Sequence, residues 1–446
     1  MQNSAAYHVL VLAPFAPVAE QGANLELKEL NPANPAAGLA EFAPVIRLAS
    51  QSPVDFAPKS LKDFHPLSLA RSLDCFSGQG PQAENASRGG SSASAVDNIL
   101  SMVKTPESSP EAFGAKASAQ SPDRRLMEEI LANREFRELE AAWRGLCLLP
   151  GEQDKIRLST LAVNRTNLLL TLQKLTSELA ESPPDLVLLG FDLDASPADL
   201  EIMRGLAELA DQLLTSAVFG LSPEFLGISG WSEQNKLQYL PHHLQRPEYA
   251  SFKSLCKQDG ACGIIPVAGQ APCRSTYLAS QAHFYFEDPG APELSPAFIL
   301  TAAILEKVQQ TGWPSGTGQL PELEYTLPQE RARELKGTGI TALAAGPGPK
   351  GQILVPQTLC ASNPFSRLCS SRLIAFLLRL RQKLGEQDPE QLTANIHQEF
   401  KDLFALYNQN LPEDMQLEAE FDNQKRLVLS LALKLGQDPL SLSLYW

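Results

Sequence analysis

Apolar residues recur at three- and four-residue steps along residues 121–149, the spacing that places side chains on one face of a helix. Charged residues, including Glu128, Arg134, Arg137 and Arg144, surround the apolar positions. The pattern predicts one helix, or two short helices that meet near Asn133, with the apolar face buried. The apolar positions are Leu126, Ile130, Phe136, Leu139, Trp143 and Leu146.

Strand and helix patterns alternate along most of the chain. Continuous apolar runs predict buried strands at residues 7–15, 155–164 and 185–194. Helical spacing covers residues 165–182, 198–217, 296–313, 370–385 and 391–409. Two alternating segments, 416–421 and 426–433, predict an antiparallel pair of strands at the end. This order predicts an α/β to α+β fold, in which helices flank a mixed sheet and antiparallel strands follow.

Two stretches rich in glycine, serine, alanine and proline, residues 77–95 and 105–122, have the composition of flexible linkers. Between them, residues 94–104 predict a short amphipathic helix whose apolar face consists of Val96, Ile99, Leu100 and Val103. So short a helix cannot bury that face alone, which favours a docking peptide over an inert linker helix. We therefore expect three parts: residues 1–76, a linker with a docking helix over 77–120, and a globular part over 121–446.

Charge and cysteine content narrow the class of protein. The chain has 37 Lys and Arg against 51 Asp and Glu, and its net charge of −14 argues against nucleic-acid binding, which normally needs a basic surface. Its seven cysteines are odd in number and contain no C-x-x-C pair, which argues against a disulfide framework and favours a reducing compartment. No signal peptide or membrane span is predicted, so we expect a cytosolic protein.

Few residues suggest catalytic chemistry. Asp192 and Asp194 follow a predicted strand and could hold Mg²⁺ in an enzyme, but no phosphate-binding loop accompanies them, so a helix-cap role is favoured. The neighbouring His242 and His243 lack a metal-binding spacing and are predicted to lie in a surface loop. We therefore expect no enzymatic activity, no metal and no cofactor.

Residues 121–149 closely resemble the helical signature of the large subunit of the type VI secretion contractile sheath. Further segments resemble that family in order: residues 190–227, 246–256, 331–343 and 370–385. The family's basic segment corresponds to residues 265–277, where little beyond Pro266, Pro272, Arg274 and Tyr277 is retained. The resemblance covers most of residues 121–446 and implies a sheath-subunit-like fold. The signature core that it identifies is Phe136, Leu139, Trp143, Gly145 and Leu146.

Two shorter segments resemble other parts of the same machine. Residues 95–104 are similar to the N-terminal helix of the large subunit, which implies docking of a Clp-type AAA+ disassembly ATPase on Val96, Ile99, Leu100 and Val103. Residues 7–70 resemble the small sheath subunit but end near Phe76, without that subunit's long C-terminal helical region. Together these likenesses imply a natural fusion of small and large sheath subunits.

The resemblance implies a structural protomer in the bacterial cytoplasm that extends and contracts around an inner tube to drive effector delivery. Its partners would be other sheath subunits or further copies of the chain, the inner tube protein, baseplate proteins and the ATPase. Because sheath subunits interlock by strand donation, inter-subunit strands are expected in residues 417–433. Two alternatives remain: a non-polymerising adaptor, baseplate or cap component, and an unrelated metal-dependent enzyme. The strand candidates are Leu417, Phe421, Leu427, Leu429, Leu431 and Leu433.

Overall fold

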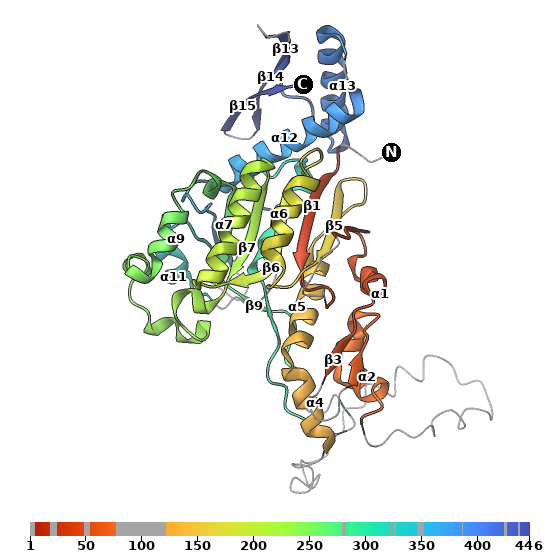
Figure 1. The fold of residues 1–446 in the computed structure, drawn as a ribbon, viewed down its shortest axis with the longest axis vertical. Helices are drawn as coiled ribbons and strands as arrows, with labels where there is room; N and C mark the ends of the chain where they lie inside the picture. Colours follow the sequence, from red (N-terminus) through yellow and green to blue (C-terminus); the bar gives the residue numbers. More distant parts are fainter. Residues whose placement is uncertain are drawn as a thin grey trace, which may run out of the picture.

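A mixed eight-stranded sheet forms the centre of the molecule, with strand order β12-β11-β8-β7-β6-β1-β5-β2 (Figure 1). The six inner strands, from β11 to β5, are parallel, and both edge strands are antiparallel to their neighbours. The strands are β1 (Tyr7–Ala13), β2 (Lys28–Leu30), β5 (Ile156–Ala162), β6 (Leu186–Leu193), β7 (Ser216–Leu221), β8 (Ile264–Ala268), β11 (Thr341–Ala345) and β12 (Gln352–Val355). The computed structural model describes residues 5–17, 25–48, 54–76, 122–278, 282, 284–321, 323, 327–345, 352–385, 387–422, 426–435 and 438–446.

Strand β1 lies between β5 and β6, so the start of the chain is part of the central sheet. Tyr7 pairs with Ile156 on one side and Val9 with Leu186 on the other. Every residue of β1 is buried, and alternate side chains enter two different cores. Covering both faces of a parallel strand explains why its sequence is a continuous apolar run.

Helices cover both faces of this sheet. On one face lie α5 (Arg134–Leu148) and α10 (Pro296–Thr311), and on the other lie α6 (Leu168–Glu178) and α7 (Pro197–Gln212). Ser196 begins α7 as an N-cap and accepts a hydrogen bond from the backbone N–H of Asp199. Shorter helices complete the second face: α8 (Leu240–His243), α9 (Ala250–Leu255) and α11 (Gln329–Glu334).

A lower extension is built on α5 (Figure 1). The α5 helix continues the direction of α4 (Pro122–Ala132), and residues 35–48 and 54–76 pack along it. Those residues contribute a small hairpin and short helices, whose apolar side chains share one core with α5 and α10. The elements are α1 (Gly38–Phe42), β3 (Ile46–Leu48), β4 (Val54–Phe56), the 3-10 turn η2 (Leu61–Phe64) and α2 (Pro66–Ser72).

A C-terminal unit lies at the opposite end of the molecule, at the top of Figure 1. It comprises α12 (Pro364–Leu384), α13 (Pro389–Leu406) and the antiparallel strands β13 (Gln416–Phe421), β14 (Leu427–Leu435) and β15 (Asp438–Tyr445). Its core is separate from the two sheet cores. The alternating pattern predicted only two strands here. The third, β15, was not predicted, although Leu440, Leu442 and Leu444 alternate with serines there.

The expected mixed sheet, flanking helices and C-terminal antiparallel strands are present. Two expectations were wrong: one concerned the cysteines and the other concerned His243. Cys262 and Cys360 form a disulfide across 98 residues of sequence, a pairing that spacing alone could not indicate. His243 is only 6% exposed, because its ring turns inward to bond Tyr249 and the Leu226 carbonyl. Among the described residues, no helix has the length and apolar character needed to cross a membrane.

His8 makes folding sensitive to acid. It is buried in β1, and its Nε2 atom lies 2.8 Å from Ser159 Oγ. Burial, followed by the charges of Arg157 and Arg379, lowers the pKa of His8 from 6.5 to about 3. Between these values the unfolded chain binds a proton that the folded chain does not, so protonation favours unfolding.

We expect His8 to lower the free energy of unfolding by about 1.4 kcal/mol per pH unit as the pH falls from near 6.5 towards 3. Denaturant unfolding curves recorded across this range measure the slope. The His8→Gln variant keeps a partner for Ser159 but removes the titration, so its slope should be flatter. Equal slopes for the two proteins would contradict this assignment.

Candidate functional site

The α5 helix joins the lower extension to the central sheet. It begins at Asn133, whose side chain accepts a hydrogen bond from the backbone N–H of Phe136 at 3.0 Å and separates α5 from α4. All five signature positions on this helix are buried; the apolar spacing predicted this for four of them, and Gly145 was identified by the resemblance. These positions are Phe136, Leu139, Trp143, Gly145 and Leu146.

Two aromatic clusters attach the first part of the chain to α5. Trp143 packs against Phe15 and Phe42 at centroid distances of 5.1 and 5.5 Å, and its Nε1–H donates to the Phe15 carbonyl. About two helical turns earlier, Phe136 contacts Phe56 and Phe64. Aromatic residues from residues 15–64 therefore hold α5 at two levels.

Gly145 allows α10 to approach the other side of α5. A Cβ atom placed on Gly145 would lie 2.5 Å from a ring carbon of Phe298, which is closer than two carbon atoms can pack. Phe298 is itself buried against Gly190 of β6. The glycine of the signature thus allows the close packing of α5 against α10.

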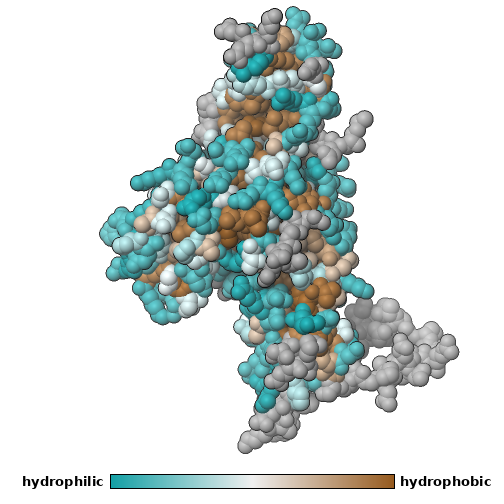
Figure 2. Space-filling model, viewed as in Figure 1, coloured by the Kyte–Doolittle hydropathy of each residue, from teal (hydrophilic) through white to brown (hydrophobic). Residues whose placement is uncertain are grey.

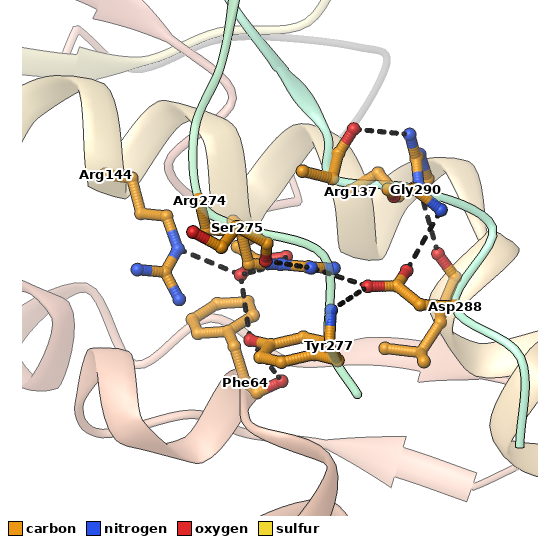
Figure 3. A network of polar contacts seen from close by, with 11 residues as sticks. Phe64, Arg137, Arg144, Arg274, Ser275, Tyr277, Asp288 and Gly290 are labelled. Atoms are coloured by element: carbon orange, nitrogen blue, oxygen red, sulfur yellow. Dashed lines mark hydrogen bonds and ion pairs between the residues drawn. The ribbon is translucent and has the colours of Figure 1, made fainter. Parts of the chain in front are cut away.

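A buried carboxylate, that of Glu140, lies on the same helix. Figure 3 shows the polar network around it, with Arg144, Arg274 and Tyr277 labelled. The Glu140 side chain is fully buried and accepts hydrogen bonds from Arg144 at 2.9 Å and Arg274 at 3.1 Å. The Tyr277 hydroxyl lies 3.4 Å from both the Glu140 carboxylate and the Phe64 carbonyl. Burial, and then the charge of Glu140, raise the pKa of Tyr277 to about 12, so the phenol stays protonated.

A second carboxylate, Asp288, holds residues 274–277 next to the helix. It accepts from the Arg274 guanidinium and from the backbone N–H of Tyr277, each at 2.7 Å. Arg137 donates to the carbonyls of Gly290 and Ala291, which follow Asp288 in the chain. Arg274 and Tyr277, which the sequence resemblance singled out, both bond to Glu140 of α5.

The C-terminal strands form a sheet with one apolar and one polar face. Leu417 pairs with Leu431, which pairs with Leu442, and all three face the helices of the C-terminal unit. Alternate positions, such as Glu418, Ser430 and Ser443, face outward. Of the strand candidates, Leu427, Leu429, Leu431 and Leu433 are therefore buried within their own chain.

The edges of this sheet are β13 and β15, because β14 is paired on both sides. In the part of the chain that the structure describes, β13 pairs with β14 alone. Phe421 at the end of β13 is 60% exposed and Tyr445 on β15 is 58% exposed. Figure 2 shows hydrophobic surface between hydrophilic residues over this unit.

The acids that suggested a metal site have other partners. Asp194 accepts from the backbone N–H of Ser196 at 2.7 Å and so shapes the start of α7. Asp192 accepts from the Gln270 amide, and its pKa is raised by burial. Within the described ranges, no group of three His, Cys, Asp or Glu side chains has a geometry that could hold a metal ion.

Residues 180–317, from just before β6 through α10, match the family model "VipB: EvpB/VC_A0108, tail sheath N-terminal domain". The central part of the chain is similar to a tail sheath domain. A curated relative, the type VI secretion system sheath protein TssC1 of Pseudomonas aeruginosa, is 25% identical over 174 residues. That match covers 34% of this chain and 34% of the relative, so about a third of the relative's length is spanned.

The family-model match over residues 180–317 includes Arg274, Tyr277 and Asp288 but not the α5 signature or the C-terminal sheet. The signature residues were identified by resemblance and are placed here by the fold. The docking-helix residues Val96, Ile99, Leu100 and Val103 lie outside the described residues.

Glu140 was not predicted as a site residue from the sequence. It lies four residues after Phe136 and three before Trp143, so it falls on the apolar face of the helix.

Proposed function

We propose that this chain is a structural protomer of a type VI-like contractile sheath. The similarity of residues 180–317 to a tail sheath domain carries the proposal. The subunit would work by assembly and sliding, with conformational free energy stored in the extended tube and no covalent chemistry. It would act in the bacterial cytoplasm around an inner tube protein, joined to the envelope through baseplate proteins.

We also propose that the chain is a fusion of a small and a large sheath subunit. The position of β1 supports this, because a strand from before residues 77–121 completes a sheet built mainly from residues after them. Residues 1–76 would correspond to the small subunit, residues 121–446 to the large subunit, and residues 77–120 to the linker. A Clp-type AAA+ ATPase would dock on the helix expected at 94–104.

The assembly contact is proposed at the edges of the C-terminal sheet. An edge strand offers unpaired backbone donors and acceptors to a strand from a neighbouring subunit. The outer edge of β13, from Leu417 to Phe421, is the favoured position, with β14 as the inner strand that supports it. Phe421 would be covered when the neighbour binds.

The Phe421→Asp variant should weaken assembly by roughly tenfold or more in critical concentration, since burial of a Phe side chain contributes about 1.5–3 kcal/mol. Light scattering against protein concentration measures this. Leu170→Asp is the matched control, because Leu170 is 62% exposed on α6, away from the C-terminal sheet. Equal effects of the two substitutions would exclude the β13 edge.

A non-polymerising adaptor, baseplate or cap component is the second candidate. The shortened small-subunit part and the reduced basic segment at 265–277 favour it. Negative-stain electron microscopy of the purified chain, alone and with its genomic neighbours, separates the two. Tubes or cogwheel-like rings support the protomer, whereas particles that stay monomeric with every neighbour support the adaptor.

A further inference from the structure

A basic pocket of about 580 Å³ opens where the lower extension meets residues 274–277. It lies between η2 and α2 on one side and α5 on the other. Its walls therefore come from three separate parts of the sequence. The lining residues are Leu61, Lys62, His65, Ser68, Arg144, Arg274, Ser275, Thr276 and Tyr277.

The lining of the basic pocket has the opposite charge to the protein as a whole. Lys62, Arg144 and Arg274 are cationic, and none of the described residues that line the pocket is acidic. The chain as a whole carries a net charge of −14. A local concentration of positive charge in such a chain attracts anions to this place more than to the surrounding surface.

The carboxylates behind the pocket do not cancel this charge. Glu140 is shared by Arg144 and Arg274, and Asp288 is bound to Arg274. Both carboxylate side chains are fully buried, so they balance two of the three cations from within. Lys62 is exposed and has no ion-pair partner among the described residues. The surplus positive charge therefore faces the opening.

His65 lies close to the same positive charges. Burial lowers its pKa, and the next causes are the charges of Arg274 and Arg144. The His65 ring also packs edge-on against Tyr277 at 5.2 Å. Tyr277 in turn lies under the Arg274 guanidinium, 3.7 Å from the ring centroid. The arginine and the two rings are thus held in place before any ligand binds, which reduces the entropy that binding costs.

We propose that the basic pocket binds the carboxylate side chains of an acidic polypeptide segment. Lys62 on η2 and Arg144 on α5 can contact successive carboxylates, while Leu61 and Tyr277 provide apolar contact beside them. The volume is larger than a single inorganic anion fills. Nucleic acid is a poorer occupant, because the phosphate backbone would approach a chain of strongly negative net charge.

The test uses the full chain and a fluorescent peptide with four glutamates and one tyrosine, with the corresponding glutamine peptide as its control. Anisotropy should show binding of the glutamate peptide, weakened by added salt, and little binding of the glutamine peptide. Lys62→Glu and Thr276→Glu each place a carboxylate at the opening and should weaken binding about tenfold. Both positions are exposed, so folding should be retained.

Lys59→Glu is the matched control, since it makes the same charge change on an exposed residue that does not line the pocket. Its affinity should stay within about twofold of the parent protein. Equal losses for Lys59→Glu and Lys62→Glu would overturn the proposal, as would undetectable binding of the glutamate peptide. Inorganic phosphate binding as tightly as the peptide would overturn the polypeptide assignment. The proposal does not depend on sheath function, so failure to form tubes leaves it intact.

Discussion

Replacing Asp185 with asparagine should lower the free energy of unfolding by about 3–5 kcal/mol, because it leaves two buried guanidinium groups without a countercharge. Asp185 is fully buried and lies 3.0 Å from Arg379 and 3.4 Å from Arg372. Its Oδ2 atom also accepts from the backbone N–H of His8 at 2.6 Å. One carboxylate therefore joins β1, β6 and α12, the helix that carries the C-terminal unit.

Denaturant unfolding measures this effect, and Glu208→Gln is the control because it neutralises an exposed carboxylate on α7. The control should change stability by less than about 0.5 kcal/mol. A triple variant with Asp185→Leu, Arg372→Met and Arg379→Met removes all three charges and should cost less than Asp185→Asn alone. If Asp185→Asn lowers the free energy of unfolding by less than about 1 kcal/mol, the two guanidinium groups do not need the charge of Asp185.

The Trp143→Ala variant should lose about 3–5 kcal/mol, the usual cost of emptying a large aromatic site in a core. Trp143 is fully buried between Phe15 and Phe42, so the cavity would open where Phe15 and Phe42 contact α5. Residues 5–76 should then become more accessible to proteases than the sheet. Limited proteolysis followed by mass spectrometry, with thermal unfolding, detects both effects.

Trp143→Phe serves as the comparison, since it keeps an aromatic ring and loses the hydrogen bond to the Phe15 carbonyl. Trp143→Phe should lower the free energy of unfolding by no more than about half as much as Trp143→Ala does. If the two variants are equally unstable, the hydrogen bond and not the ring volume holds this contact. If alanine is tolerated, the lower extension is attached to α5 by other residues.

Local patterns predicted much of the fold because they are set by nearby residues. The apolar face of α5, the buried runs of β1 and β6, and the Ser196 cap of α7 all follow from spacing within a few positions. The third C-terminal strand was also encoded this way, since leucine and serine alternate along β15. It was missed because Gly436, Gln437, Asp438 and Pro439, just before and at its start, have the composition of a turn.

Contacts between distant residues could not be read from spacing. The placement of β1 between β5 and β6 depends on strand order, which local patterns do not contain. The Cys262–Cys360 disulfide and the Glu140–Arg274 ion pair likewise join residues far apart in sequence. Resemblance identified Arg274 and Tyr277 as retained, but their partners on α5 became visible only in the folded structure.

The central position of β1 has a consequence for synthesis. Tyr7 can pair only after Ile156 has been synthesised, and Val9 only after Leu186. At about 5–20 residues per second, a ribosome leaves this apolar strand without its neighbours for on the order of ten to thirty seconds. Exposed apolar strands aggregate and distant pairings form slowly. We therefore expect the nascent chain to bind a chaperone early. Slower translation between residues 13 and 156 should lower the yield of folded protein.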